Sequence, residues 1–372
     1  MSSTLIIPDK KPKVVVFDLD ETLGCFAQFG IFFESLIEFF NNATIGYSHF
    51  NELIDLYPEV FRTSIVRILE YIRKKKQSGI CSKVMIYTNN QGPAKWVQHI
   101  RSYLEQRLTQ HDTAGLLHQP GKANTTTTTT SPPFFDRIIG GFNVLDNTKN
   151  DPDRIERTTH EKTVNDFLRC SRLSPNVEIC FLDDLLHQKM VDEKVYYIKL
   201  QSYHSYIPFE QFITRFINSK LYEQHFSALP CLTAGGQYMV ANTNNKQVHK
   251  QMSAIELNNV LMKRVKMNRY DSKKILSRVN PREIDEIISK YILFHLQLFF
   301  KEVKPQINVL TPNTNALANS KNKTRKVSKS MLSKSIGKKR VFIINKESAM
   351  NAFKNETNAN KHEKTRKQSQ KK

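Results

Sequence analysis

The chain has 372 residues, of which 39% are hydrophobic and 24% are charged, so it is long enough for one or two domains with a buried core. It contains no apolar run of about 18 residues and no apolar stretch near its start, which argues against a membrane-spanning helix and a secretory signal peptide. The five cysteines are scattered without a Cys-x-x-Cys spacing, so we expect an intracellular protein, cytoplasmic or nuclear, without disulfides or a zinc site.

The net charge of +21 is concentrated near the C-terminal end of the chain. Residues 321–372 contain 17 Lys or Arg and 3 Glu, so they carry +14 of the +21. We expect this segment either to solubilise the protein and carry a nuclear-localisation signal, or to contact nucleic acid without sequence preference. The composition from residue 304 onward predicts a disordered basic tail. Its apolar run 341–344 is too isolated to fold alone, so we expect it to dock elsewhere.

Five short apolar runs predict the strands of one sheet, at residues 13–17, 83–87, 137–139, 178–182 and 195–198. Helical spacing of apolar residues predicts helices between or after these runs, at residues 61–72, 96–104, 164–168 and 209–216. Strands that alternate with helices predict an α/β, Rossmann-like fold with a mostly parallel five-stranded sheet.

The pattern also predicts how the chain is divided. Residues 1–218 would form the α/β domain, with a small, partly helical insert at 24–60 and a flexible low-complexity insertion at 109–133. Residues 219–303 would form a helical extension, and residues 304–372 the tail. Inserts this short predict a small cap or none over the carboxyl ends of the strands.

The helical extension contains one strongly amphipathic segment. Asn280, Pro281 and Glu283 have the spacing of a helix start, with proline at the first helical position. Apolar residues then recur on one face from Ile284 to Phe299, so this helix must bury that face against another part of the protein or a partner.

Residues 14–22, with the sequence Val-Val-Val-Phe-Asp-Leu-Asp-Glu-Thr, are the most informative segment. Asp18 and Asp20 leave the predicted strand on the same face, at the end where open α/β sheets bind ligands. Two adjacent carboxylates repel each other, and a hard cation such as Mg²⁺ relieves that repulsion. The alternative is a solvated turn.

Other polar residues occupy equivalent positions along the chain. Thr88 and Asn89 follow the second predicted strand, Lys162 opens the helix before the fourth, and Asp183 and Asp184 follow the fourth. In a parallel sheet these positions converge on one edge. There, one carboxylate would attack phosphorus and another would act as acid and base, while lysine and metal neutralise the transferred charge. Thr88 and Asn89 would hold the phosphoryl oxygens.

These residues resemble the motifs of the haloacid dehalogenase (HAD) superfamily over about residues 13–218. The segment Asp18-Leu19-Asp20-Glu21-Thr22-Leu23 is similar to its first motif, Thr88 to the second, Lys162 to the third, and Asp183-Asp184 to the fourth. The resemblance implies that Asp18 is the nucleophile and Asp20 the general acid and base. It also implies that Asp18, the Asp20 backbone carbonyl and Asp183 bind Mg²⁺, and that the enzyme is a phosphatase.

Two positions keep alternatives open. Lys149 is an alternative to Lys162, which could be ordinary surface charge. Asp184 is either a further metal ligand or a helix cap, because it follows the more suitable Asp183.

Two features of the motifs point to different branches of the superfamily. With Glu21 in place of the commoner Gly, the first motif resembles that of the RNA polymerase C-terminal-domain and NLI-interacting-factor-like protein phosphatases. The run from Thr88 to Gly92, Thr-Asn-Asn-Gln-Gly, resembles a motif of polynucleotide 3′-phosphatases with one residue inserted. A small cap favours a phosphorylated macromolecule, and protein more than nucleic acid. The alternatives are a phosphatase of nucleic-acid ends and a catalytically weak binding protein.

Overall fold

The computed structural model describes residues 11–41, 47–90, 92, 95–116, 132–142, 157–232, 238–239, 246–279, 281–300, 340–345 and 347. Within these ranges only the backbone is described at 111–116, 232, 238–239 and 246–249. The predicted tail therefore lies outside the described residues, apart from the short segment around residue 342. Lys149 and most of the 109–133 insertion also lie outside them.

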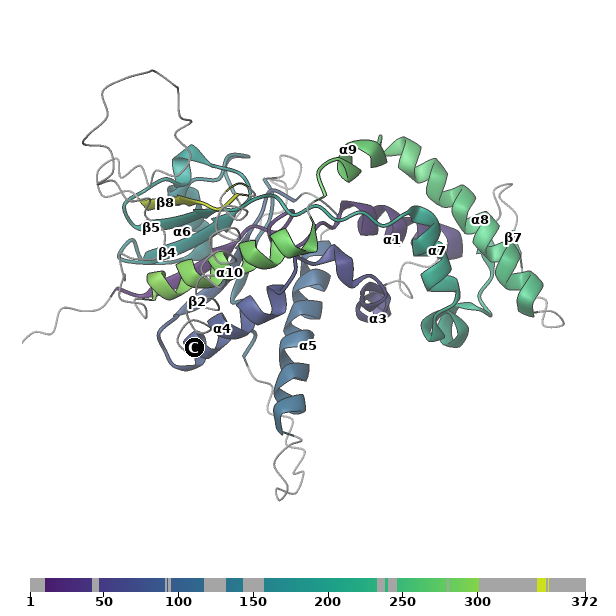
Figure 1. Ribbon diagram of the computed structural model, residues 1–372, viewed down its shortest axis with the longest axis horizontal. Coiled ribbons are helices and arrows are strands. Elements are labelled where there is room, and N and C mark those ends of the chain that lie inside the picture. The colour runs from purple at the N-terminus through teal and green to yellow at the C-terminus, as the bar shows by residue number, and fades with distance from the viewer. Residues whose placement is uncertain are drawn as a thin grey trace, which may run out of the picture.

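The main sheet has six strands, all parallel, and lies toward the left in Figure 1. Its strand order is β3-β2-β1-β4-β5-β8, with bounds Arg137–Ile139, Lys83–Tyr87, Lys13–Phe17, Glu178–Asp183, Val195–Lys199 and Arg340–Ile343. The α/β class and the parallel sheet are confirmed. The predicted number of strands, five, is wrong because the apolar run near residue 342 pairs with β5 as a sixth strand.

The order of the strands reverses between β1 and β4, because the chain builds outward from β1 on one side and from β4 on the other. Ligands of open α/β sheets bind at such a switch point, beyond the carboxyl ends of the strands. The two strands are in register, with Val16 opposite Phe181 and Phe17 opposite Leu182. The residues that follow them are therefore neighbours.

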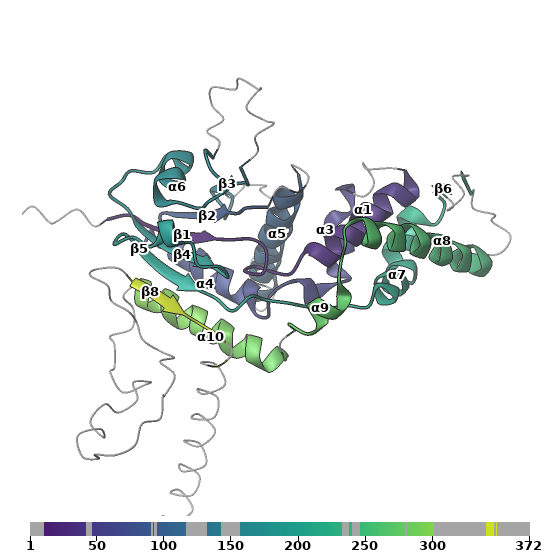
Figure 2. The ribbon, with the colours of Figure 1, turned by 90° about the horizontal axis from the view of Figure 1, so that it is seen from above.

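Both faces of the sheet are buried, since side chains alternate along each strand. Val15 and Phe17 belong to the larger core cluster, with apolar residues of α4, α5 and α10, whereas Val14 and Val16 contact the cluster that includes α6. Seen from above, α6 lies on one side of the sheet and α4 and α10 lie on the other (Figure 2).

The nine α-helices among the described residues are α1 Ala27–Phe40, α3 Phe50–Asp55, α4 Ile65–Gln77, α5 Trp96–Leu116, α6 Val164–Ser171, α7 Phe209–Ile217, α8 Lys246–Met267, α9 Ser272–Leu276 and α10 Arg282–Phe299. Shorter elements are two single turns at Pro58–Val60 and Gln188–Met190, a π-helical turn at Tyr222–Phe226, and the hairpin β6 Cys231–Leu232 with β7 Tyr238–Met239. No described helix has the length and apolar character needed to cross a bilayer.

The helices predicted from periodicity are present, with shifted ends. Helix α5 continues to Leu116, so the first part of the predicted flexible insertion is helical. Helix α10 begins at Arg282, and Pro281 occupies the cap position without a side-chain hydrogen bond. The expectation of proline at the first helical position was therefore wrong. Asn280 lies outside the described residues.

The segment predicted as a small insert, 24–60, contains α1 and α3. Its helix α1 contacts α8, and α7 contacts α8 as well, so the three form a helical layer beside the sheet (Figure 1). Phe32 of α1 packs against Phe212 and Phe216 of α7. Arg264 of α8 bonds the carboxylates of Glu34 and Glu38 at 2.7 and 2.6 Å. Contacts of α1 and α7 with α8 therefore cross the predicted boundary at residue 218.

Helix α10 buries its apolar face against α4 and β5. His295 on this helix bonds the Tyr196 hydroxyl at 2.9 Å, and the Tyr196 ring stacks on Phe342 of β8 at a centroid distance of 4.5 Å. The amphipathic segment and the isolated apolar run therefore both dock on β5.

Candidate active site

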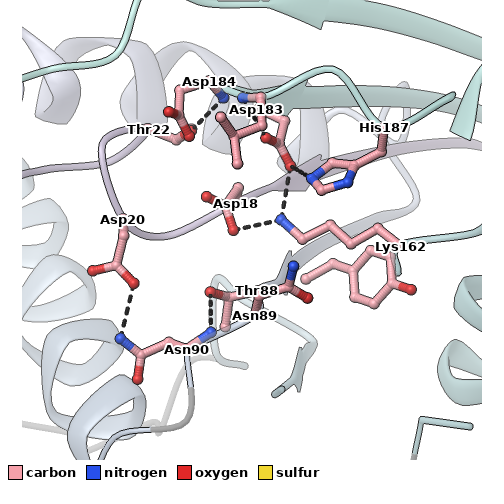
Figure 3. Close-up of polar contacts among 12 residues, drawn as sticks. Asp18, Asp20, Thr22, Thr88, Asn89, Asn90, Lys162, Asp183, Asp184 and His187 are labelled. Carbon is pink, nitrogen blue, oxygen red and sulfur yellow. Dashed lines mark hydrogen bonds and ion pairs between the residues drawn. The ribbon is translucent and has the colours of Figure 1, made fainter. Parts of the chain in front are cut away.

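The predicted site residues come together at the carboxyl edge of the sheet (Figure 3). Asp18 and Asp20 follow β1, Thr88 follows β2, and Asp183 ends β4. Lys162 comes from the segment that leads into α6, whose start is capped when the Thr163 hydroxyl accepts a hydrogen bond from the Asp166 amide. The turn before α6 thus carries a lysine to the ends of β1 and β4.

Lys162 bridges two carboxylates at the centre of the site. Its Nζ donates to Asp18 Oδ1 at 2.6 Å and to Asp183 Oδ2 at 2.7 Å. All three side chains are buried, with exposed fractions of 2% for Lys162, 10% for Asp18 and 0% for Asp183. Buried charges are stable only when they are paired, so these contacts argue against lysine as ordinary surface charge and against the solvated turn.

The two carboxylates bridged by Lys162 have opposite pKa shifts. Burial raises the pKa of Asp18 to about 7, opposed by the charge of Lys162 and assisted by the charge of Asp183. Burial also disfavours ionised Asp183, but hydrogen bonds and charges from His187 and Lys162 outweigh it and lower that pKa. His187 Nε2 lies 3.4 Å from Asp183 Oδ2. From its sequence context alone, this histidine was expected to pack or to face solvent, so its contact with the site was missed.

Asp20 has a different environment from Asp18. Its Oδ2 accepts a hydrogen bond of 2.8 Å from Asn90 Nδ2, and burial raises the pKa of its carboxyl group. The Asn90 backbone amide donates to Thr88 Oγ1 at 3.1 Å. Asn90 therefore joins the acid after β1 to the hydroxyl after β2 (Figure 3). Asn90 was not among the predicted site residues, because its position after Thr88 and Asn89 was the only sign of its role in the sequence.

Asp184 lies against the turn that follows β1. Its backbone amide donates to the Thr22 hydroxyl at 3.1 Å, and its Oδ2 accepts from Ser202 Oγ at 2.7 Å. Burial raises the pKa of Asp184, and the negative charge of Asp183 adds to that rise. The Asp184 carboxylate thus lies beside those of Asp18 and Asp183, and it also accepts a hydrogen bond from Ser202, which is outside the site.

The carboxylates of Asp18, Asp183 and Asp184 form a group suited to a divalent cation. One oxygen of each lies within 4.8 Å of the others, and all three residues are buried. Three buried carboxylates with only one lysine between them leave excess negative charge, and oxygen ligands are those that Mg²⁺ prefers. The residues therefore fit the predicted cation. The Asp20 carboxylate is outside this group and bonds Asn90 instead.

Arg157 is a further buried cation, which the sequence analysis did not identify. It donates to the Thr88 carbonyl at 3.1 Å, to Asn89 Oδ1, and to the His160 carbonyl at 2.7 Å. Its guanidinium lies 4.8 Å from the centre of the Tyr87 ring. Arg157 holds the backbone after β2 and occupies one side of the Asn89 amide, which leaves the Asn89 Nδ2 group for another acceptor.

Arg62 supports the turn that carries Asp20. This fully buried guanidinium donates to the carbonyls of Glu21 and Thr22 and to Asp285 Oδ1, each at 2.7 Å. Asp285 lies in the first turn of α10, so Arg62 joins this helix to the turn after β1. A local sequence pattern gives no sign of this link, because its ends are more than 200 residues apart.

Comparison of the chain with protein-family models, with curated proteins and with solved structures found no match in any of the three. The resemblance to the HAD superfamily therefore stays a prediction. It rests on the motif residues in the sequence.

Proposed function

We propose that this protein is a HAD-type phosphatase that hydrolyses phosphomonoesters with Mg²⁺ through an aspartyl-phosphate intermediate. The observation that carries the proposal is the buried bridge from Lys162 to Asp18 and Asp183, at the switch point of a parallel sheet. A nucleophilic carboxylate, a fixed cation and additional carboxylates around one position are the groups that phosphoryl transfer requires.

In the proposed reaction a carboxylate oxygen of Asp18 attacks phosphorus, and the bond between phosphorus and the leaving oxygen breaks. The leaving oxygen takes a proton from Asp20, whose raised pKa favours the protonated form needed for this step. Asp20 then accepts a proton from the water that attacks the aspartyl phosphate. Phosphate leaves and Asp18 is regenerated. The bond from Asn90 fixes one Asp20 oxygen and leaves the other for the proton.

The surrounding groups would stabilise the charge on the transferred phosphoryl group. Lys162 neutralises Asp18 and the phosphoryl oxygens near it. Thr88 Oγ1 accepts a hydrogen bond from Asn90, so its own hydrogen is available for a phosphoryl oxygen. Asp18, Asp183 and Asp184 would hold Mg²⁺, which supplies further neutralising charge when bound.

The substrate we propose is a phosphorylated protein. Asn89, next to the buried Thr88, is exposed, and Leu185 and Leu186, directly after Asp184, have exposed fractions of 57% and 39%. Exposed apolar and amide side chains beside buried acids support approach by a large substrate that contributes its own apolar contacts. A nucleic-acid end would favour a basic surface here, and the large positive charge lies instead in the tail sequence.

The test measures phosphate release from phosphopeptides, 3′-phosphorylated oligonucleotides and sugar phosphates, with Mg²⁺ and with chelator. We expect Mg²⁺-dependent release that is fastest from phosphopeptides. The Asp18→Asn variant should lose turnover and keep the circular dichroism spectrum of the wild type, because an amide cannot form the intermediate. The Asp192→Asn variant, altered after β4 but outside the site, should retain activity. Equal release by Asp18→Asn would refute the mechanism, and faster release from oligonucleotides would refute the protein substrate.

A further inference from the structure

A second group of ligand-type side chains joins the turn after β1 to the segment before α7. Glu21, Cys25 and His204 each place one ligand atom within 4.8 Å of the others. Glu21 and Cys25 follow β1, whereas His204 belongs to the segment between β5 and α7. A thiolate, an imidazole and a carboxylate together are ligands that Zn²⁺ accepts and that Mg²⁺, which requires oxygen, does not.

The histidine of this group contains an unsatisfied polar atom. His204 Nδ1 is buried from solvent, and it has no hydrogen-bond partner among the residues that the structure describes. Buried polar atoms in proteins are nearly always paired, so such an atom requires an explanation. Beside it, Cys25 is only 4% exposed, and its sulfur is 4.0 Å from the Ser205 carbonyl, which is a weak contact at most.

The backbone holds the ligand-bearing segments together. Glu21 has a φ of 54°, a left-handed conformation that is rare for residues other than glycine, asparagine and aspartate. Its amide donates to the Gly24 carbonyl at 2.7 Å, and its carbonyl accepts a hydrogen bond of 2.8 Å from the Tyr203 amide. Since Tyr203 precedes His204, this last bond joins the segment of the first two ligands to that of the third.

We propose that Glu21, Cys25 and His204 form a binding site for a Zn²⁺-class cation, with water as the fourth ligand. The cation would bind one imidazole nitrogen of His204 together with the Cys25 sulfur and a Glu21 oxygen. Binding deprotonates the Cys25 thiol, and the released proton passes to the solvent as the sulfur–metal bond forms. The site would hold Glu21, the residue next to Asp20, without sharing a ligand with the carboxylates of the proposed Mg²⁺ site.

Sequence spacing could not reveal this site. The expectation that the chain has no zinc site came from the absence of Cys-x-x-Cys, a pattern that detects only ligands close in sequence. Here the third ligand is almost 180 residues from the second, and the fold alone brings them together. The inference does not depend on the proposed phosphatase function.

The experiment uses Co²⁺ as the probe, with the full-length protein and excess Mg²⁺ to fill the carboxylate site. A bound thiolate produces a sulfur-to-cobalt charge-transfer band in the near-ultraviolet, which carboxylates and imidazoles do not. We expect one Co²⁺ per chain with this band, and displacement of it by Zn²⁺. Cys25→Ser should abolish the band, and His204→Asn should weaken binding at least tenfold. Cys81→Ser, which alters another buried cysteine outside the group, should leave binding unchanged.

The outcomes are distinct. A Co²⁺ titration of the wild type without a charge-transfer band would overturn the proposal, and this measurement needs no variant to fold. A band that persists in a folded Cys25→Ser protein would overturn it as well, because another thiol would then be the ligand. The band should remain in Asp18→Asn, so loss of phosphatase activity and loss of the zinc-class site are separate results.

Discussion

Replacing Arg62 with methionine should destabilise the protein and loosen the turn that carries Asp20. The Arg62 side chain is 0% exposed and forms an ion pair of 2.7 Å with Asp285, whose side chain is 4% exposed. Its other bonds, each of 2.7 Å, go to the carbonyls of Thr22, Glu21 and Gln201. Methionine fills much of the same volume but donates no hydrogen bond.

The magnitude follows from these contacts. Removing one partner of a buried ion pair costs about 3–5 kcal/mol, because the remaining charge is left unpaired. Asp285 keeps one bond, from the Thr63 amide at 2.8 Å, and it can take up a proton, since burial already raises its pKa. The three carbonyls each lose a donor worth about 1 kcal/mol. Because the carbonyl losses add to that of the ion pair, we expect a decrease of at least about 3–5 kcal/mol in the free energy of unfolding.

Urea unfolding followed by circular dichroism measures this change. The matched control is Arg215→Met, because Arg215 also forms a 2.7 Å ion pair, with Glu59, but the two side chains are 34% and 44% exposed. That exposed pair should contribute less than about 1 kcal/mol. In the Arg62→Met, Asp285→Asn double variant the loss should be smaller than the sum of the single losses, by at least about 1 kcal/mol.

Two results would refute this reasoning. One is a loss for Arg62→Met no larger than that for Arg215→Met, which would mean that the buried pair contributes no more than a surface pair. The other is strict additivity in the double variant, which would show that Arg62 and Asp285 do not depend on each other.

Four further predictions concern the site and the tail. Asp183→Ala should decrease turnover and raise the Mg²⁺ concentration needed for half-maximal activity, because it removes a buried oxygen ligand; a metal titration measures both. Arg157→Met should raise KM more than it lowers kcat, because it frees the backbone after β2; steady-state kinetics separate the two. The pKa of Asp18 is about 7 in the folded protein against an ordinary value of 3.8, so in chelator the stability should fall as pH rises from about 4 to about 7; Asp18→Asn should show a smaller fall over the same pH range in urea unfolding. Deleting residues 346–372 spares β8 and should reduce non-specific nucleic-acid binding and its salt dependence, without changing hydrolysis of a small phosphoester; a salt titration of both proteins measures this.

Each of these has a contradicting outcome. An unchanged Mg²⁺ titration in Asp183→Ala would remove that residue from the metal site. A pure kcat effect in Arg157→Met would assign it to chemistry and not to binding. A pH dependence of stability that is equal in wild type and Asp18→Asn would show that Asp18 is not the titrating group. Equal nucleic-acid affinity after the deletion would exclude those residues as the contact.

The sequence by itself determined five of the six strands of the sheet and several of the polar residues that meet at its edge. The five strands from β1 to β5 are short runs rich in branched and aromatic residues, and in each the apolar pattern ends within a residue of the strand in the structure. Because all these strands are parallel, polar residues after them had to meet at one edge. That is why Asp18, Thr88, Lys162 and Asp183 could be named without the structure.

The tertiary structure decided what no local pattern encodes. The run near residue 342 became a strand because β5 offered an unpaired edge, and α1 packs against α7 and α8, which lie far away in the sequence. Arg62 looked like any charged residue until burial brought it to Asp285. Propensity and periodicity report interactions within a few residues, whereas these contacts join positions more than 100 residues apart. Their stability comes from burial and pairing, which exist only once the chain is folded.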